Sequence, residues 1–223
     1  MPSDARLRGL YALTPALADT AELAARVSAA LEGGAALVQY RAKDASRELA
    51  LAQARALRAV CHAHAVRLIV NDSLELALAC GADGVHLGRD DISVREARAA
   101  FPRGLIGVSC YDDPARALEA ARGGADYVGI GSVFDSPTKP AAVRAPLALL
   151  AMAKEISGLP VVAIGGITSA NARLAVDAGA DMVAVISSLF GAPDVRAAAR
   201  ELARAFQFQD QGAHHVRAQP RAV

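Results

Sequence analysis

The sequence predicts an α/β protein in which strands and helices alternate and close into a single barrel. The main observation is a Gly-Ala-x-x-Val motif that recurs four times, at residues 34–38, 81–85, 124–128 and 179–183. Each copy follows an Ala-rich stretch and precedes a short apolar run, as expected where a helix ends at glycine and a buried parallel strand begins. The copies lie 43 to 55 residues apart, which is room for two strand–helix units each. Four copies therefore predict eight strands and a closed (β/α)8 TIM barrel.

The expected strands are short apolar or β-branched runs that end at proline, glycine or polar residues. They cover residues 10–14, 36–40, 67–70, 84–87, 105–109, 127–130, 160–164 and 182–186. Pro15 ends the first strand, and Asn71 and Asp72 end the third. Runs of this length and composition are typical of strands that are buried on both faces.

The expected helices lie between the strands. They cover residues 21–32, 46–63, 73–80, 94–101, 114–122, 146–156, 169–178 and 193–206. Thr20 can cap the first helix, and Ser46 opens the second. Pro114 stands at a first helical position, where a missing N–H costs nothing, and Pro102 follows the end of the fourth helix.

The chain is expected to form one domain. No linker or shift in composition appears before residue 206, so residues 1–206 are assigned to a catalytic barrel. Residues 207–223 have no apolar period and are expected to form a disordered tail. An open doubly wound sheet also alternates strands and helices, but eight strands and evenly spaced repeats favour closure.

Composition excludes several classes of protein. Hydrophobic residues make up 53% of the chain, which supports a sizeable core, and a net charge of +1 argues against nucleic-acid binding. No apolar run approaches the roughly 18 residues of a membrane span, and residues 1–9 do not resemble a secretory signal. Cys61, Cys80 and Cys110 fit neither a disulfide framework nor a zinc site, so a reducing, cytoplasmic location is expected.

Cationic residues follow the second strand. Gln39, Arg41 and Lys43 alternate along the chain, and period-two spacing is expected to place them on one side. In such a barrel the residues after the strands form the mouth that carries the chemistry. Two cations and an amide there suit a ligand that bears phosphate.

Carboxylates follow the next two strands. Asp72 comes after the third strand, and Asp90 and Asp91 come after the fourth, where only one of the two needs to point inward. Neighbouring carboxylates that face cations form a Mg²⁺ site once a pyrophosphate is bound, because Mg²⁺ takes a few carboxylates together with phosphate oxygens and water. The residue types alone therefore predict a pyrophosphate and a magnesium ion.

Hydroxyl and glycine residues follow the later strands. Ser109 is a hydroxyl donor after the fifth strand, and the loop at 136–140 carries two hydroxyls and a lysine. Gly165-Gly166 and Ser187-Ser188 follow the seventh and eighth strands, where barrels of this type hold phosphate. Taken alone, His86 is more often a core histidine. Three aspartates inside the repeats are expected to be turn residues without chemistry: Asp83, Asp126 and Asp181.

In this ordered set of motifs the chain resembles thiamine phosphate synthases, over residues 10–206. The resemblance rests on 39–43 (Gln-Tyr-Arg-Ala-Lys), 71–72 (Asn-Asp), 85–88 (Val-His-Leu-Gly) with Asp91, 107–109 (Gly-Val-Ser), 129–131 (Gly-Ile-Gly), 136–140 (Ser-Pro-Thr-Lys-Pro), 162–167 (Val-Ala-Ile-Gly-Gly-Ile) and 185–187 (Val-Ile-Ser). It implies a Mg²⁺-dependent transferase that joins 4-amino-5-hydroxymethyl-2-methylpyrimidine pyrophosphate to 4-methyl-5-(2-phosphoethyl)thiazole. The products would be thiamine phosphate and pyrophosphate.

The resemblance also implies a role for each site residue. Asp72 and Asp91 would ligate Mg²⁺, while Gln39 and His86 would line the pyrimidine pocket. The pyrophosphate would be held by Arg41, Lys43, Asn71, Ser109 and Lys139, of which Arg41, Lys43, Ser109 and Lys139 would be catalytic. The thiazole phosphate would be held by Ser136, Thr138, Gly166, Ile186 and Ser187. Pyrophosphate would leave first, and the thiazole nitrogen would attack a pyrimidine carbocation, so no general base is needed.

Three alternatives remain open at this point. The sister thiazole tautomerases lack the metal acids and carry a histidine after the sixth strand, whereas residues 131–134 here are Gly-Ser-Val-Phe. A non-catalytic phosphate-binding barrel would tolerate loss of the acids or of Lys139. Another phosphate-binding barrel enzyme, such as one of tryptophan synthesis, would need its own acid–base pair. The expected partners are two small molecules. A homo-oligomer is compatible with the sequence, and so is a lid role for residues 132–144.

Overall fold

The computed structural model describes residues 7–135 and 143–207, in which eight parallel strands close into a barrel in chain order, with β8 beside β1. The strands are β1 Gly9–Leu13, β2 Ala35–Tyr40, β3 Arg67–Asn71, β4 Gly84–Leu87, β5 Leu105–Tyr111, β6 Tyr127–Ile130, β7 Val161–Ile164 and β8 Met182–Val185. This closure confirms the predicted TIM barrel and is incompatible with an open doubly wound sheet.

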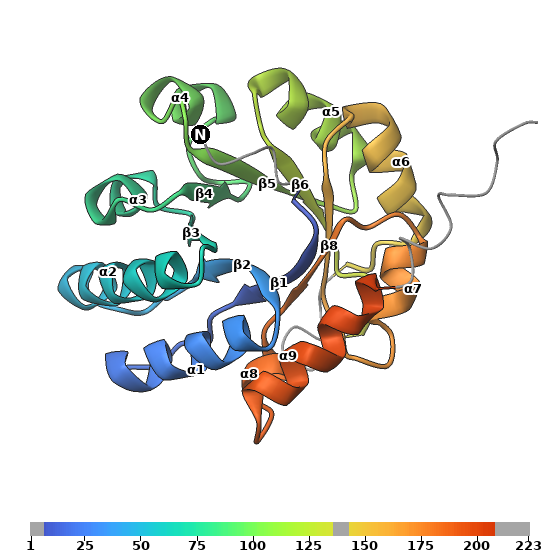
Figure 1. Cartoon of the computed structure of the whole chain (residues 1–223). Coiled ribbons are helices and arrows are strands. Elements are labelled where there is room, and N and C mark those ends of the chain that lie inside the picture. The colour runs from blue at the N-terminus through green and yellow to red at the C-terminus, as the bar shows by residue number, and fades with distance from the viewer. Residues whose placement is uncertain (1–6, 136–142, 208–223) are drawn as a thin grey trace, which may run out of the picture.

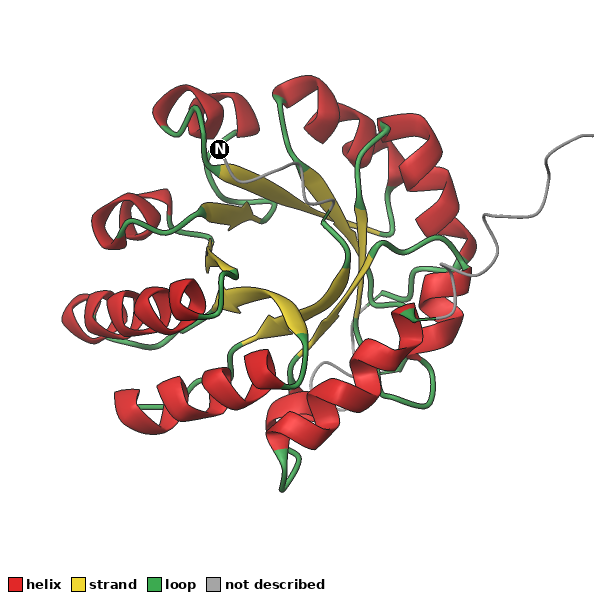
Figure 2. Ribbon diagram, viewed as in Figure 1, coloured by secondary structure: helices red, strands yellow, loops and turns green. Residues whose placement is uncertain are grey.

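Helices surround the strands on the outside, as Figures 1 and 2 show. They are α1 Thr20–Glu32, α2 Arg47–Ala63, α3 Leu74–Cys80, α4 Val94–Ala100, α5 Pro114–Gly123, α6 Ala148–Ser157, α7 Ala172–Asp177, α8 Ser187–Phe190 and α9 Val195–Ala203, followed by a 3₁₀ turn at Arg204–Phe206. No helix in the described part of the chain is long and apolar enough to cross a membrane.

Local differences from the sequence-based expectation have local causes. Asp19, and not Thr20, caps α1, because its carboxylate accepts the Ala21 and Glu22 N–H groups at 2.7 and 3.0 Å. Helix α8 was not predicted, since four residues are too few to show an apolar period. The predicted tail from residue 208 onward lies outside the described residues, as does the central part of the loop after β6, residues 136–142.

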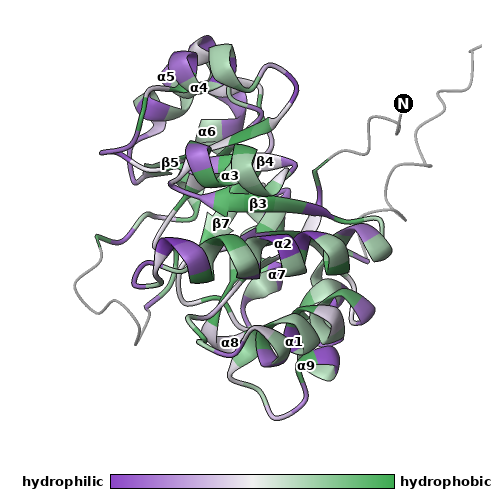
Figure 3. Cartoon of the chain, turned by 90° about the vertical axis from the view of Figure 1, so that its left-hand side faces the viewer, coloured by the Kyte–Doolittle hydropathy of each residue, from purple (hydrophilic) through white to green (hydrophobic). Residues whose placement is uncertain are grey.

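The core has two layers. The larger layer packs strand side chains against the helices, and Figure 3 shows β3 in green while helices such as α2 carry both green and purple stretches. The inner layer fills the barrel with Tyr11, Leu13, Leu37, Ile69, Tyr127, Val162, Met182 and Ala184. In a chain without tryptophan, the rings of Tyr11 and Tyr127 are the largest side chains of this inner layer.

The Tyr127 ring requires a glycine on the neighbouring strand. Gly107 of β5 lies opposite Tyr127 of β6 in the register of the sheet. A Cβ atom at position 107 would lie 2.0 Å from Cζ of Tyr127, far inside van der Waals contact. The Gly-Val-Ser sequence in the middle of β5 thus makes space for an aromatic ring inside the barrel.

The aspartates of the repeats have a structural role that was not predicted from the sequence. Each accepts the backbone N–H of a residue near the start of the preceding strand: Asp83 from Leu68 at 2.8 Å, Asp126 from Ile106 at 2.7 Å and Asp181 from Val161 at 3.0 Å. Each also pairs with a basic side chain of the helix that comes before the first of the two strands, namely His62 of α2, Arg98 of α4 and Lys154 of α6 respectively. These three clamps join consecutive strands at the end of the barrel opposite the mouth.

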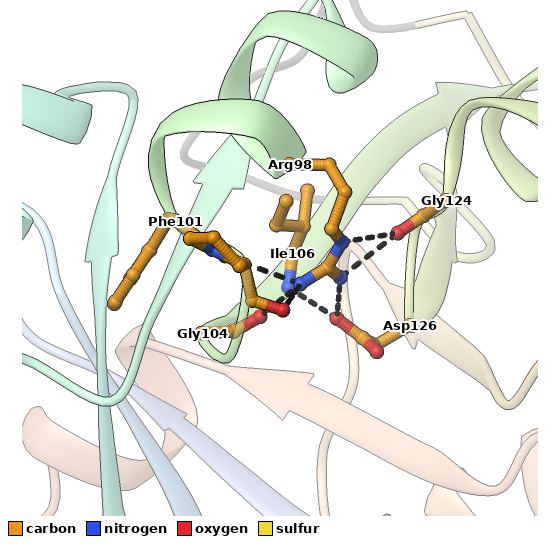
Figure 4. A network of polar contacts seen from close by, with 7 residues as sticks. Arg98, Phe101, Gly104, Ile106, Gly124 and Asp126 are labelled. Carbon is orange, nitrogen blue, oxygen red and sulfur yellow. Dashed lines mark hydrogen bonds and ion pairs between the residues drawn. The ribbon is translucent and has the colours of Figure 1, made fainter.

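Arg98 makes the most extensive of these clamps (Figure 4). Its guanidinium donates to Asp126 at 2.6 Å and to the Gly104 and Gly124 carbonyls at 2.7 and 2.8 Å. It therefore joins the end of α4, the turn before β5 and the turn before β6. The first repeat has Ala36 where the others have aspartate, and it forms no such clamp.

Candidate active site at the barrel mouth

Asp72 stands directly after β3 in a backbone conformation that is unusual for a residue with a side chain. Its φ is +63°, and its N–H donates to the His86 carbonyl of β4 at 2.8 Å. A left-handed conformation costs a non-glycine residue of the order of 1 kcal/mol. Such residues cluster at functional sites, where the surrounding structure holds them. Here the hydrogen bond between Asp72 N–H and the carbonyl of β4 stabilises the left-handed conformation.

Asp91 approaches Asp72 from the loop after β4. Its Oδ2 atom accepts the Gly88 N–H at 2.7 Å, which turns the carboxylate back toward the strand end. Burial raises the pKa of Asp72 above its ordinary value, and the nearby Asp91 carboxyl, which is also hydrogen-bonded to it, raises it further. Asp90 is exposed. Of the two candidate acids after β4, the geometry therefore favours Asp91.

Two cations oppose this carboxylate pair. Lys43 and Arg41 lie near enough to lower the pKa of Asp72, against the effects of burial and Asp91. Both residues follow the end of β2 at Tyr40, so strand alternation does not place them, contrary to the spacing argument from sequence. The buried Thr14 hydroxyl accepts the Arg41 N–H at 2.9 Å and fixes the backbone there.

A cavity of about 500 Å³ opens beside these residues, between α2 and α3. Its lining includes the polar side chains of Lys43, Asn71 and Asp72 and apolar side chains such as Leu51 and Leu76. The cavity extends outward from the strand ends and is not lined by His86 or Ser109. Of the two acids, Asp72 lines this cavity and Asp91 does not.

The donor set fits Mg²⁺. Two carboxyls in contact, one with a raised pKa, are an arrangement that a divalent cation would relieve. Within residues 7–135 and 143–207, no group of three or more histidine, cysteine or acidic side chains could hold a metal ion by itself. Mg²⁺ commonly binds through one or two carboxylates together with substrate phosphate oxygens. The site therefore suits a metal that arrives with a phosphorylated ligand.

A second set of site residues is joined by buried tyrosines. The Tyr11 hydroxyl accepts from the Gln39 amide nitrogen at 2.9 Å and lies 2.8 Å from the Tyr127 hydroxyl. His86 contacts the Tyr127 hydroxyl through Nδ1 at 3.2 Å and Ser109 Oγ through Nε2 at 2.9 Å. Burial lowers the pKa of His86 from 6.5 to about 4, so its ring is neutral at pH 7. Gln39, His86 and Ser109 were predicted from the sequence, whereas the two tyrosines that connect them were not.

The glycine pair after β7 forms a turn that only glycine adopts readily. Gly165 and Gly166 have φ values of +101° and +64°, and a Cβ on Gly166 would lie 2.3 Å from the Asp135 carbonyl oxygen. Asn171 accepts the Thr168 N–H at 2.8 Å and donates to the Gly166 carbonyl at 3.0 Å. An asparagine three residues after a Gly-Gly-Ile-Thr stretch could have suggested this bracing contact.

Helix α8 joins the same region. The Ser188 hydroxyl donates to the Ile167 carbonyl at 2.6 Å, which ties α8 to the turn after β7. Ile186 and Ser187 stand where β8 passes into α8. Gly166, Ile186 and Ser187 are thereby placed on two adjoining segments. The three remaining predicted residues, Ser136, Thr138 and Lys139, lie outside the described residues.

Comparison with known proteins agrees with this geometry. The sequence profile of the thiamine monophosphate synthase family matches residues 10–189. The thiamine-phosphate synthase of Thiobacillus denitrificans is 58% identical, with 89% of this chain and 94% of that protein covered. That of Thioalkalivibrio sulfidiphilus is 52% identical, with 91% and 97% covered.

Solved structures give the same result. The thiamine phosphate pyrophosphorylase of Pyrococcus furiosus superimposes with a TM-score of 0.79 at 38% identity, over 90% of this chain and 96% of that one. A 3-hexulose-6-phosphate synthase, at 23% identity and a TM-score of 0.65, shares the fold alone. The chain belongs to the thiamine monophosphate synthase family, which makes it a transferase of thiamine biosynthesis.

Proposed function

We propose that the protein joins 4-amino-5-hydroxymethyl-2-methylpyrimidine pyrophosphate to 4-methyl-5-(2-phosphoethyl)thiazole, with release of pyrophosphate. The observation that supports this most directly is the pair of carboxyls, Asp72 and Asp91, in contact with each other and opposed by Arg41 and Lys43. This arrangement suits a pyrophosphate bound with Mg²⁺. The family membership supports the same reaction.

Asp72 and Asp91 would hold Mg²⁺, together with oxygens of the substrate pyrophosphate. When bound, Mg²⁺ would supply positive charge to the leaving pyrophosphate. Arg41, Lys43 and Lys139 add cationic groups around the same anion, while Asn71 and Ser109 add hydrogen-bond donors. Fixed donors and cations aimed at charge that develops on a leaving group lower the barrier to its departure.

Gln39 and His86 line the pyrimidine pocket in this proposal. The thiazole phosphate binds at the turn after β7 and the start of α8, through Gly166, Ile186 and Ser187, with Ser136 and Thr138 from the loop after β6. Holding the two rings face to face makes the second step effectively unimolecular. The thiazole nitrogen can then attack the pyrimidine carbocation without a general base.

The decisive experiment incubates purified protein with both substrates and Mg²⁺ and measures thiamine phosphate. Asp72→Asn and Asp91→Asn are expected to lower kcat at least about a hundredfold, in the range found when a group that stabilises the leaving charge is removed. Asp90→Asn is the matched control, because this exposed neighbour should be replaced with little effect. Absence of product from the native protein would refute the proposed reaction. Equal loss in all three variants would refute the metal assignment.

Two further properties belong to this proposal. The three cysteines are free and buried, and burial raises the pKa of Cys61 and Cys110 to about 12, which fits unreactive thiols in a reducing cytoplasm.

The partners are small-molecule substrates, and the protein is proposed to need neither nucleic acid nor a membrane. A homo-oligomer would leave the mouth accessible if helices on the outside of the barrel formed its contact. Gel filtration with light scattering would measure the oligomeric state.

A further inference from the structure

Five polar side chains form one continuous chain of hydrogen bonds through the inside of the barrel. In order they are Gln39 of β2, Tyr11 of β1, Tyr127 of β6, His86 of β4 and Ser109 of β5. The two tyrosines are 1% and 0% exposed, so water does not replace their partners. The two ends of the chain, Gln39 and Ser109, are residues that the proposed function assigns to the two parts of one substrate.

Each side chain of this network can donate only a limited number of hydrogen bonds. Burial keeps both phenols protonated by raising their pKa, and the two ring nitrogens of His86 contact the uncharged hydroxyls of Tyr127 and Ser109, which suits a neutral ring. A neutral imidazole has one N–H donor and one acceptor nitrogen. The hydrogen bonds can therefore run in only two directions, and every member must follow the same one.

The Gln39 amide decides between the two directions. Its Nε2 atom donates to the Tyr11 oxygen, so the Tyr11 hydrogen is available only to Tyr127. Tyr127 must then donate to Nδ1 of His86, which leaves the proton of the ring on Nε2. That N–H donates to Ser109 Oγ, so the hydroxyl hydrogen of Ser109 is left for another acceptor. The opposite direction would satisfy these groups only with the Gln39 amide turned over.

We propose that Tyr11 and Tyr127 are positioning residues that make Gln39 a hydrogen-bond acceptor and Ser109 a hydrogen-bond donor at the same time. In this direction the Gln39 oxygen, which takes no hydrogen bond within the described part of the chain, is offered to the ligand. Ser109 in turn offers its hydrogen. The roles of Gln39 and Ser109 are coupled because reversing the hydrogen bond at one end would exchange the donor and acceptor roles of all five groups.

This polarity matches a ligand with a donor at one end and an anion at the other. The proposed substrate, on which this step rests, carries an amino group on the pyrimidine and a pyrophosphate on its side arm. An acceptor at Gln39 suits the amine, and a donor at Ser109 suits a pyrophosphate oxygen. An oxo-substituted pyrimidine would meet the wrong group at Gln39, so the same network would also set specificity.

The histidine tautomer tests this inference without any turnover. Nitrogen-15 spectra of the imidazole rings, with His86 assigned by its absence from His86→Gln, should show His86 as the Nε2–H tautomer. Tyr127→Phe removes the donor to Nδ1 and should give a mixture of tautomers. Tyr11→Phe is the matched control: it removes the same hydroxyl one step further away, which leaves His86 Nδ1 as the remaining acceptor for the Tyr127 hydroxyl, so the Nε2–H form should persist. An Nδ1–H tautomer in the native protein would overturn the direction, and an unchanged tautomer in Tyr127→Phe would overturn the role of Tyr127.

A double-mutant cycle tests the consequence for the reaction. Tyr127→Phe should lower kcat/KM for the pyrimidine pyrophosphate about tenfold, the effect of one misdirected hydrogen bond to a charged group, and should leave KM for the thiazole phosphate within about twofold. In a Ser109→Ala background the same change should cost less than about twofold, because Tyr127 acts through Ser109. Multiplicative losses would overturn the coupling. A native protein that makes no thiamine phosphate would refute the proposed function. The tautomer of His86 would still show whether the hydrogen bonds of the network run in the proposed direction.

Discussion

Replacing Asp126 with alanine tests the clamps that join consecutive strands at the end of the barrel away from the mouth. The substitution removes the acceptor of two hydrogen bonds, one from the Ile106 N–H and one from the Arg98 guanidinium. Arg98 keeps its backbone carbonyl partners, so most of its own hydrogen bonds survive. The strand N–H has no such substitute.

The magnitude follows from burial. Ile106 is 0% exposed, and a buried N–H that loses its acceptor costs about 1–3 kcal/mol. The ion pair is partly exposed, with side chains at 27% and 34%, and adds about 1 kcal/mol or less. The expected loss is therefore about 2–3 kcal/mol. In a chain of this size that lowers Tm by roughly 4–12 °C.

Urea unfolding followed by far-ultraviolet circular dichroism measures this loss. Asp83→Ala and Asp181→Ala are matched controls, because each also removes the acceptor of a strand N–H. Their basic partners are more exposed, at 40% for His62 and 48% for Lys154, so each should cost less than Asp126→Ala. The kcat of folded Asp126→Ala should equal that of the native protein, since the clamp lies opposite the mouth. A loss below about 0.5 kcal/mol, or the same loss at all three sites, would refute the reasoning.

Three further outcomes are expected. Burial lowers the pKa of His86 to about 4, so between pH 6.5 and 4 this residue is protonated in the unfolded chain but not in the folded protein. The free energy of unfolding should therefore fall by up to about 3 kcal/mol between pH 6.5 and 4. The same pH series on His86→Gln should lack this fall. Gly107→Ala should destabilise the fold by about 3 kcal/mol, because its Cβ would lie 2.0 Å from Tyr127. A free energy of unfolding from urea titration within about 0.5 kcal/mol of the native value would contradict this. Gly166→Ala, with φ +64°, should raise KM for the thiazole phosphate at least about tenfold, and steady-state kinetics that show no rise would exclude the turn from the phosphate site.

The predicted positions of the elements depend on signals that are local in sequence. A glycine with positive φ ends α3 and α5, at Gly81 and Gly124, and an apolar strand follows each one, as the repeats predicted. The bounds of β4 and β6 agree with those expected from sequence. Local signals fail where competing residues adjoin, as with Asp19 and Thr20, or where an element is as short as α8.

Some residues of the candidate site could likewise be predicted from local sequence signals, and others could not. Because the strands are parallel and closed, residues after their carboxyl ends must meet at one mouth, so Asp72, Asp91 and Arg41 could be named from sequence order. The residue types alone could not separate Asp91 from Asp90, because two neighbouring aspartates differ only in direction. The resemblance named Asp91, and the structure favours it because Asp91 contacts Asp72 while Asp90 is exposed. It also showed that Thr14, directly after β1, fixes the backbone of Arg41.

The amino-acid sequence by itself determined the barrel, the order of its strands and most of the residue types at its mouth, because glycine signals and apolar runs act within a few residues. Only the tertiary structure decided which polar groups are partners. Tyr11 and Tyr127 are 116 residues apart in the chain and 2.8 Å apart in the barrel, and the aspartates of the repeats contact strands some 15 to 20 residues earlier. The physical reason is that the register of the closed strands decides which polar groups face one another, and periodicity along the chain does not record that register.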